Sequence, residues 1–306
     1  MKNDVLIIAG ATASGKTRLA IELAKHFSGE IVSADSMQIY KGMDIGTAKP
    51  TREERQEAVH HMIDVCDVTD GYTVKDYVMG AERAIEDIIS RGRVPIVAGG
   101  TGMYLDCLTG RMVLDQPKGD ERIRQELTLV YENEGIDALY EIFLKEAPEK
   151  KDKIHKNDIK RVIRAIEQAR AGEAEEQKYL PKAYNYLWFT IDIDREKLYN
   201  RIDLRVDEMF AAGLLDEVER VILPVRDKCT TALQSIGYKE VLMYFDGLLS
   251  LEEAKELIKK RTRNYAKRQM TWFRRNDVIN SLSAENAAAQ AIFIIEKYKN
   301  GREVQS

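Results

Sequence analysis

The hydrophobic positions in the first hundred residues follow two alternating patterns. A continuous apolar run with the length of a buried β-strand occurs at 5–9, and two further short segments, at 30–34 and 94–98, also have the pattern of strands. Between these runs, apolar residues recur every three or four positions over 16–27 and 73–91, which predicts amphipathic helices. Strands that alternate with helices in this way predict an α/β fold with a parallel sheet and right-handed crossovers.

The rest of the pattern indicates a core and an inserted module. Residues 36–72 show no clean period and are expected to form a long functional loop with some helix. No strand pattern appears from 115 to 183, and helices are predicted at 120–134, 135–146 and 158–171. After a strand at 186–193, only helices are expected, at 195–212, 214–223, 238–246 and 251–275. We therefore expect an α/β core of residues 1–114 and 184–306, with an all-helical insertion at 115–183.

The composition is that of a soluble globular protein. Of 306 residues, 44% are hydrophobic and 32% are charged, which argues against both disorder and a membrane protein. The longest nearly apolar stretches, 5–13 and 287–295, are shorter than the roughly 20 residues that a membrane span needs. The start of the chain lacks a signal peptide pattern and the three cysteines lie far apart, so we expect a cytoplasmic protein without a disulfide framework or structural zinc.

The net charge of −4 conceals two basic clusters. Residues 255–275 contain nine lysines and arginines against one acid, and residues 150–170 contain eight against three acids. Charged residues on a helix usually form a solvated face, but cations in this excess favour contact with phosphates. The two clusters therefore predict a local site for a polyanion.

The segment from Gly10 to Thr17 reads GATASGKT, which matches the phosphate-binding pattern GxxxxGK[ST] between a predicted strand and a predicted helix. Backbone N–H groups and the helix N-terminus can surround phosphate oxygens. Lys16 adds a full positive charge, and the Thr17 hydroxyl can hold Mg²⁺. The pattern predicts a phosphate site but does not by itself distinguish a kinase from other enzymes.

Asp35 ends the predicted strand that follows the first helix. The carboxyl end of that strand lies beside the phosphate loop in an open α/β sheet. Asp35 could therefore bind Mg²⁺ or act as a base on a second substrate. The strand at 94–98 ends in Gly-Gly-Thr and lacks the Mg²⁺-binding aspartate typical of a kinase.

Five further segments resemble the signatures of the tRNA dimethylallyltransferases, also called tRNA isopentenyltransferases, in their usual order. These segments are Asp35–Pro50, Val97–Tyr104, His155–Asp158, Ile236–Glu240 and Thr262–Arg274. The chain departs from the family at Lys156, where a proline is usual, and at 171–182, which is short and acidic. Both departures fall within the predicted helical insertion.

The resemblance implies a P-loop NTPase-like fold and a defined reaction. A dimethylallyl group would pass from dimethylallyl diphosphate to N6 of the adenosine immediately 3′ of a tRNA anticodon, with diphosphate as the leaving group. The resemblance also implies that the protein is a monomer, that Thr17 holds Mg²⁺, and that the macromolecular partner is the anticodon stem-loop of tRNA. No membrane partner is implied. The expected diphosphate ligands are Gly10, Thr12, Ala13, Ser14, Gly15, Lys16 and Thr17.

Two further residues are assigned catalytic roles by the resemblance. Asp35 would accept a proton from N6, because the adenine amine is a poor nucleophile; the alternative is a ligand of Mg²⁺-bound water. Arg205 would bind the diphosphate; the alternatives are a surface ion pair with Asp207 or Glu208, or the use of Arg201 instead.

The tRNA-binding residues implied by the resemblance fall in three parts of the chain. They are Asp35, Ser36, Met37, Gln38, Thr101, Arg124, Ile159, Lys160, Arg161, Val162, Ile163, Lys267, Arg268 and Arg274. Thr101 follows two glycines that permit close approach of a nucleotide, although a tight turn alone would explain them.

Three other functions compete with this one. A P-loop kinase would need ATP and a phosphate acceptor, a prenyltransferase for free adenine nucleotides would not need the basic clusters, and a non-enzymatic RNA-binding switch would leave Asp35 unexplained.

Overall fold

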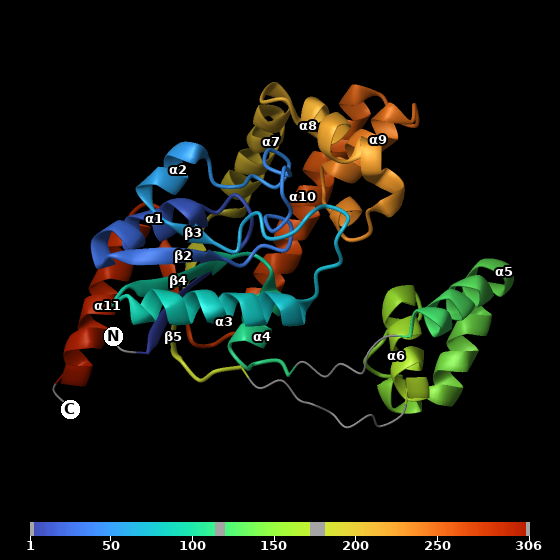
Figure 1. Ribbon diagram of the computed structural model, residues 1–306, viewed down its shortest axis with the longest axis horizontal. Helices are drawn as coiled ribbons and strands as arrows, with labels where there is room; N and C mark the ends of the chain where they lie inside the picture. The colour runs from blue at the N-terminus through green and yellow to red at the C-terminus, as the bar shows by residue number, and fades with distance from the viewer. Residues whose placement is uncertain (1–2, 114–119, 172–180, 304–306) are drawn as a thin grey trace. The chain divides into compact units, whose positions relative to one another are not determined.

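The computed structural model describes residues 3–113, 120–171 and 181–303 (Figure 1). In chain order the helices and strands are β1 (Asp4–Ala9), α1 (Lys16–Phe27), β2 (Gly29–Ser33), α2 (Arg52–Glu57), β3 (His60–His61), α3 (Val74–Ser90), β4 (Val94–Gly99), α4 (Gly102–Leu108), α5 (Glu121–Glu146), α6 (Ile159–Ala171), β5 (Asn185–Asp192), α7 (Arg195–Ala211), α8 (Leu214–Val221), α9 (Tyr238–Phe245), α10 (Leu251–Phe273), β6 (Ile279–Ser283) and α11 (Ala287–Glu303). Three short 3₁₀ helices lie at Pro148–Lys150, Leu223–Lys228 and Ala232–Gln234.

The strands form one parallel sheet in the order β3-β2-β4-β1-β5-β6, so the expected α/β fold with a parallel sheet is confirmed. The expectation of helices alone after residue 193 is wrong, because β6 pairs with β5 at one edge. The other edge strand, β3, was not predicted either. Both edge strands are short and largely polar, so neither contains the apolar run that marks a buried strand.

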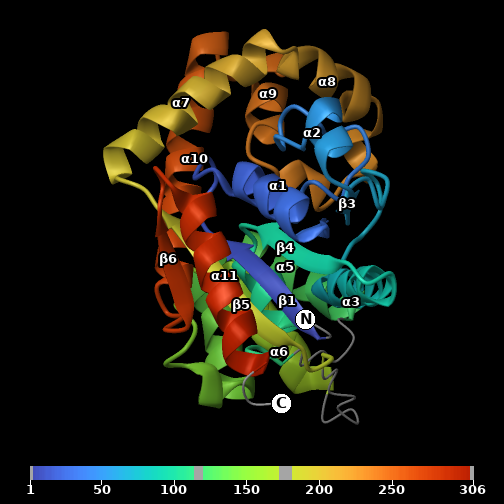
Figure 2. The ribbon, with the colours of Figure 1, turned by 90° about the vertical axis from the view of Figure 1, so that its left-hand side faces the viewer.

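Helices cover both faces of this sheet. On one face, α1 and α11 pack against strand residues that include Leu6, Ile8 and Phe189, and Figure 2 shows α11 lying across the strands. On the other face, α3 and α4 pack together through the stacked rings of Tyr77 and Tyr104. Because α1 covers the centre of the sheet, the loop before it is fixed at the carboxyl end of β1.

The chain divides into two compact units, Met1–Met112 with Pro181–Ser306 and Val113–Leu180. The second unit contains α5 and α6, and its described residues form no strand. Gly135 interrupts α5 with φ of +86°, between the two helices that the sequence predicts on either side of it. Apolar side chains such as Phe143 and Ile166 give this unit its own core. The usual proline position holds Lys156, which pairs with Asp137.

The ends of β2 and β4 approach unusually closely. The Ala34 amide donates to Ala98 (2.8 Å), and the Thr101 amide donates to the Ala34 carbonyl (3.1 Å). A Cβ atom at Gly99 would lie 2.1 Å from the same carbonyl oxygen. Glycine is therefore required at this position, and the contact brings the residues after both strands together.

None of the helices in the described ranges has the length and apolar character needed to span a bilayer.

Replacing Gly99 with alanine should lower the free energy of unfolding by about 1–3 kcal/mol, because the new methyl group must displace backbone. Urea denaturation measures the change. Gly71→Ala is the matched control, since a Cβ atom there has no neighbour within 4 Å. Equal midpoints for the two variants would contradict the proposed close contact.

Candidate active site

The phosphate loop lies between β1 and α1, in the strand–loop–helix context that the sequence predicts. Gly10 and Gly15 have φ angles of +147° and +101°, values that favour glycine. Ala13 also has a positive φ, of 61°. These angles turn the chain sharply, so that the loop closes over the N-terminus of α1.

Lys16 is the first residue of α1, and its ammonium group donates to the Ala11 carbonyl at 2.6 Å. Burial, together with the positive charge of Arg205, lowers the pKa of Lys16 to about 8, whereas Asp35 opposes this shift. Within the described residues, the buried Ser14 hydroxyl has no hydrogen-bond partner. The loop therefore contains a cation whose charged form is disfavoured by burial and a buried hydroxyl that has no partner among the described residues. An anionic ligand could interact favourably with both groups.

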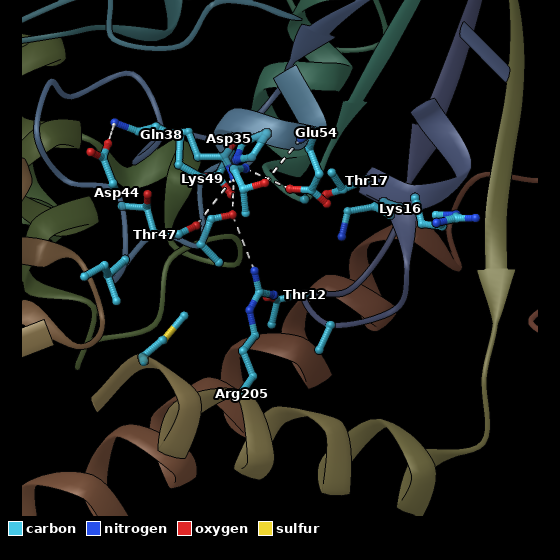
Figure 3. Close-up of a pocket in the computed structure, with 18 of the residues that line it drawn as sticks. Thr12, Lys16, Thr17, Asp35, Gln38, Asp44, Thr47, Lys49, Glu54 and Arg205 are labelled. Carbon is cyan, nitrogen blue, oxygen red and sulfur yellow. Dashed lines mark hydrogen bonds and ion pairs between the residues drawn. The ribbon is translucent and has the colours of Figure 1, made fainter. Parts of the chain in front are cut away.

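A cavity of about 1030 Å³ opens over this loop (Figure 3). Its walls come from the phosphate loop, the ends of β2 and β4, the loop at 44–55, α7 and α10. Residues that line it include Thr12, Ala13, Gly15, Lys16, Thr17, Asp35, Gln38, Arg201, Arg205 and Gln269. Five of the seven expected diphosphate ligands thus share one cavity with Asp35 and Arg205, whereas Gly10 and Ser14 are not among its lining residues.

A second cavity of about 250 Å³ adjoins the first, and Thr12, Asp35 and Arg205 line both. Its wall is partly apolar, with Met37, Ile202, Val206, Met209, Ile236 and Ile258. Asp35 and Arg205 therefore lie where the two cavities meet.

Asp35 lies two residues after the end of β2, and its Oδ1 atom accepts from the Met37 amide at 2.9 Å. This bond orients the carboxylate, and its other oxygen has no hydrogen bond to a residue in the described part of the chain. The Thr101 hydroxyl oxygen accepts from the Ser36 amide at 3.1 Å, which connects the end of β2 to that of β4. Gln38 accepts from the Ser33 hydroxyl at 2.9 Å. Asp35 and Gln38 thus line the larger cavity, and Asp35, Ser36 and Met37 line the smaller one; Thr101 is not among the lining residues of either but is joined to Ser36 by its hydrogen bond.

Arg205 extends from α7 toward the phosphate loop (Figure 3), where it donates to the Thr12 hydroxyl (3.3 Å) and the Ala48 carbonyl (3.5 Å). Burial lowers the pKa of Arg205, and Asp35 counteracts that shift. Asp207 is paired with Lys259 instead, at 2.9 Å. Arg205 therefore faces the cavity, although Arg201 lines the same chamber from a more exposed position.

Two residues of α10 were not assigned a role from the sequence. Gln269 is buried; it donates to the Gly100 carbonyl and accepts from the Thr12 amide, both at 2.9 Å. Tyr265, one turn earlier, interacts with Thr101 and Gln269, and burial raises its pKa to about 12. A polar pair spaced i, i+4 beside an apolar stripe was the available signal.

The basic cluster on α10 separates into two groups. Four cations pair with carboxylates: Lys255 with Glu252, Lys259 with Asp207 and Glu256, Arg261 with Glu240, and Arg263 with Asp203. The other cations are exposed and have no ion pair with any described residue: Lys260, Lys267, Arg268, Arg274 and Arg275. The expectation that the whole cluster is available to phosphates is therefore corrected to this second group.

The helical unit presents only some of the residues expected to contact tRNA. The side chains of Val162 and Ile163 are buried in its core, so they are not surface groups. Arg124 pairs with the buried Glu167 at 3.2 Å. Ile159 is partly exposed, and Lys160 and Arg161 are exposed at the start of α6.

Comparison with known proteins adds an independent line of evidence. A family model described as IPP transferase matches residues 38–276. A tRNA dimethylallyltransferase of Exiguobacterium sp. is 46% identical over 275 residues, which cover 89% of this chain and 88% of the relative.

Solved structures agree with this assignment. The crystal structure of the full-length tRNA isopentenylpyrophosphate transferase from Bacillus halodurans has a TM-score of 0.70 and 37% identity, and the match covers 98% of this chain and 96% of that one. A eukaryotic dimethylallyltransferase acting on tRNA has a TM-score of 0.78 and 30% identity, with 98% and 80% covered. Similarity of this extent in both sequence and fold leaves one conclusion: the chain belongs to the IPP transferase family.

Proposed function

We propose that this protein transfers a dimethylallyl group from dimethylallyl diphosphate to N6 of the adenosine immediately 3′ of a tRNA anticodon. The observation that carries the proposal is the shared cavity in which the phosphate loop, Asp35 and Arg205 meet. Membership of the IPP transferase family supports the reaction type. We also propose that the enzyme is cytoplasmic and acts as a monomer.

The phosphate loop is proposed to bind the diphosphate as a leaving group. Lys16, Arg205 and the loop amides would face the negative charge that builds up as the allylic C–O bond breaks. Thr17 lines the cavity and could hold Mg²⁺ together with diphosphate oxygens and water, which suits an ion that usually binds few protein ligands. When bound, Mg²⁺ would help to neutralise the leaving group.

Asp35 is proposed to take the proton from N6 as the new C–N bond forms. Its carboxylate lies at the junction of the two cavities, so an adenine that enters one cavity would meet a diphosphate bound in the other. An adenosine in a stacked anticodon loop reaches such a site only when it is flipped out. Ser36, Met37, Gln38 and Thr101 would then surround the flipped nucleoside.

Labelled dimethylallyl diphosphate offered with tRNA, with AMP or with no acceptor tests the proposal directly. We expect transfer to tRNA alone and no requirement for ATP. An absolute requirement for ATP would favour a P-loop kinase, transfer to AMP would favour a free-nucleotide enzyme, and tRNA binding without transfer would favour a non-enzymatic switch.

Asp35→Asn should lower kcat by about 10²–10⁴-fold, because asparagine keeps the size of the side chain but cannot accept the proton. KM for dimethylallyl diphosphate and the Mg²⁺ dependence should change little. Steady-state kinetics on a tRNA transcript measure these values. If high Mg²⁺ restores a lowered kcat, Asp35 acts as a ligand of the metal or of its bound water. If kcat equals that of the wild-type protein, Asp35 is not the base.

Affinity for dimethylallyl diphosphate should fall above pH 8. Lys16, with its pKa lowered to about 8, is charged below that value and loses its proton above it, so the attraction to diphosphate weakens as the pH rises. Calorimetric titration between pH 7 and 9.5 measures this. Lys16→Ala should bind at least about tenfold more weakly and show no such decline. Constant affinity of the wild-type protein over this range would contradict the role of Lys16.

Alanine at both Lys267 and Arg268 should weaken tRNA binding and reduce the salt slope by about one per lost phosphate contact. The matched control is the double alanine variant of Lys255 and Arg226, two cations that already pair with carboxylates. Filter binding from 50 to 300 mM salt gives both slopes. If the two double variants behave alike, the tRNA binds elsewhere.

A further inference from the structure

The carboxylate of Glu217, on α8, lies buried beneath the loop at 44–48. Glu217 is 2% exposed. Its Oε2 atom accepts from the amides of Asp44 (2.9 Å) and Ile45 (2.8 Å), and its Oε1 atom accepts from the amide of Gly46 (3.0 Å) and from the Tyr238 hydroxyl. One buried side chain therefore satisfies three consecutive backbone donors of this loop.

The same loop contributes to the active site through its carbonyl groups. Gln38 donates to the carbonyls of Thr47 (3.4 Å) and Ala48 (3.3 Å). Arg205 donates to the Ala48 carbonyl as well, at 3.5 Å. Figure 3 shows Gln38, Thr47 and Arg205 around this part of the cavity. The loop therefore has Glu217 on one side and two proposed substrate-binding side chains on the other.

Close packing fixes the loop at the same place. A Cβ atom at Gly46 would lie 2.4 Å from the ring of Tyr238, so only glycine fits between the ring and the carboxylate. Hydrogen bonds to an ionised acceptor are about twice as strong as neutral ones and set direction as well as distance. Movement of this loop would therefore break several contacts at once.

We propose that Glu217 is a positioning residue for the transfer reaction. By fixing the loop at 44–48, it holds the carbonyls that direct Arg205 toward the diphosphate and Gln38 toward the nucleoside. This inference rests on the proposed function. A purely structural role of Glu217 between α8 and α9 predicts a different kinetic result. Loss of folded protein lowers the total rate of transfer but leaves KM unchanged.

Glu217→Gln tests the proposal with little change in shape. One amide oxygen can still accept from Asp44 and Ile45, but the new NH₂ group would face the N–H of Gly46, and two donors cannot pair. The KM for dimethylallyl diphosphate should rise, and kcat per folded enzyme should fall, each on the order of tenfold. Circular dichroism at the assay temperature gives the folded fraction.

Tyr238→Phe is the matched control. It removes one hydrogen bond from the same carboxylate but keeps the aromatic ring and all three loop amides in place. Both variants should lose thermal stability, whereas only Glu217→Gln should change KM. Wild-type kinetic constants in Glu217→Gln, or equal changes of KM in the two variants, would overturn the proposal.

Hydrogen exchange in the wild-type protein provides a test that does not depend on the variant folding. The amides of residues 44–46 should exchange slowly and become slower when dimethylallyl diphosphate binds. Fast exchange, or no response to the ligand, would overturn the inference. A wild-type enzyme that fails to transfer the dimethylallyl group would instead remove the proposed function, so the two failures can be told apart.

Discussion

The contact between the ends of β2 and β4 determines how the site is assembled. Because these strands are parallel neighbours, their carboxyl ends meet at one edge, and the missing side chain of Gly99 lets the backbone at Ala34 approach within a distance that excludes any Cβ atom. Asp35 and Thr101 follow directly on either side of this contact. The phosphate loop lies at the same edge because β1 is the next strand along.

The electrostatic balance of the site depends on that arrangement. Lys16 and Arg205 are both partly buried; Asp35 acts on both of them, and Glu208 and Glu54 act on Arg205 as well. Burial disfavours the charged form of both cations and lowers their pKa values in spite of these acids. A diphosphate bound as proposed would add negative charge beside both cations and so favour their charged forms.

The sequence predicted the parts of this structure that depend on local pattern. The strand at β1, the helix at 16–27 and the phosphate loop between them follow from apolar runs, helical spacing and glycine positions. The edge strand β6 escaped prediction because backbone pairing with β5 holds it, not an apolar run. Gln269 and Glu217 were missed for a related reason. Each is a polar residue whose partners are backbone groups far away in the chain, which no local pattern records.

The number of charged residues in α10 did not predict which of its cations are paired with acids. Nine cations against one acid predicted a site for a polyanion, but the acids that pair with four of these cations come from α7, α9 and the first half of α10 itself. Lys267 and Arg268, two members of the unpaired group, lie in the second half of the helix. In that same half, Gln269 contacts the phosphate loop and Tyr265 contacts Thr101. RNA held by these cations would therefore lie within one helical turn of the residues that connect α10 to the catalytic cavity.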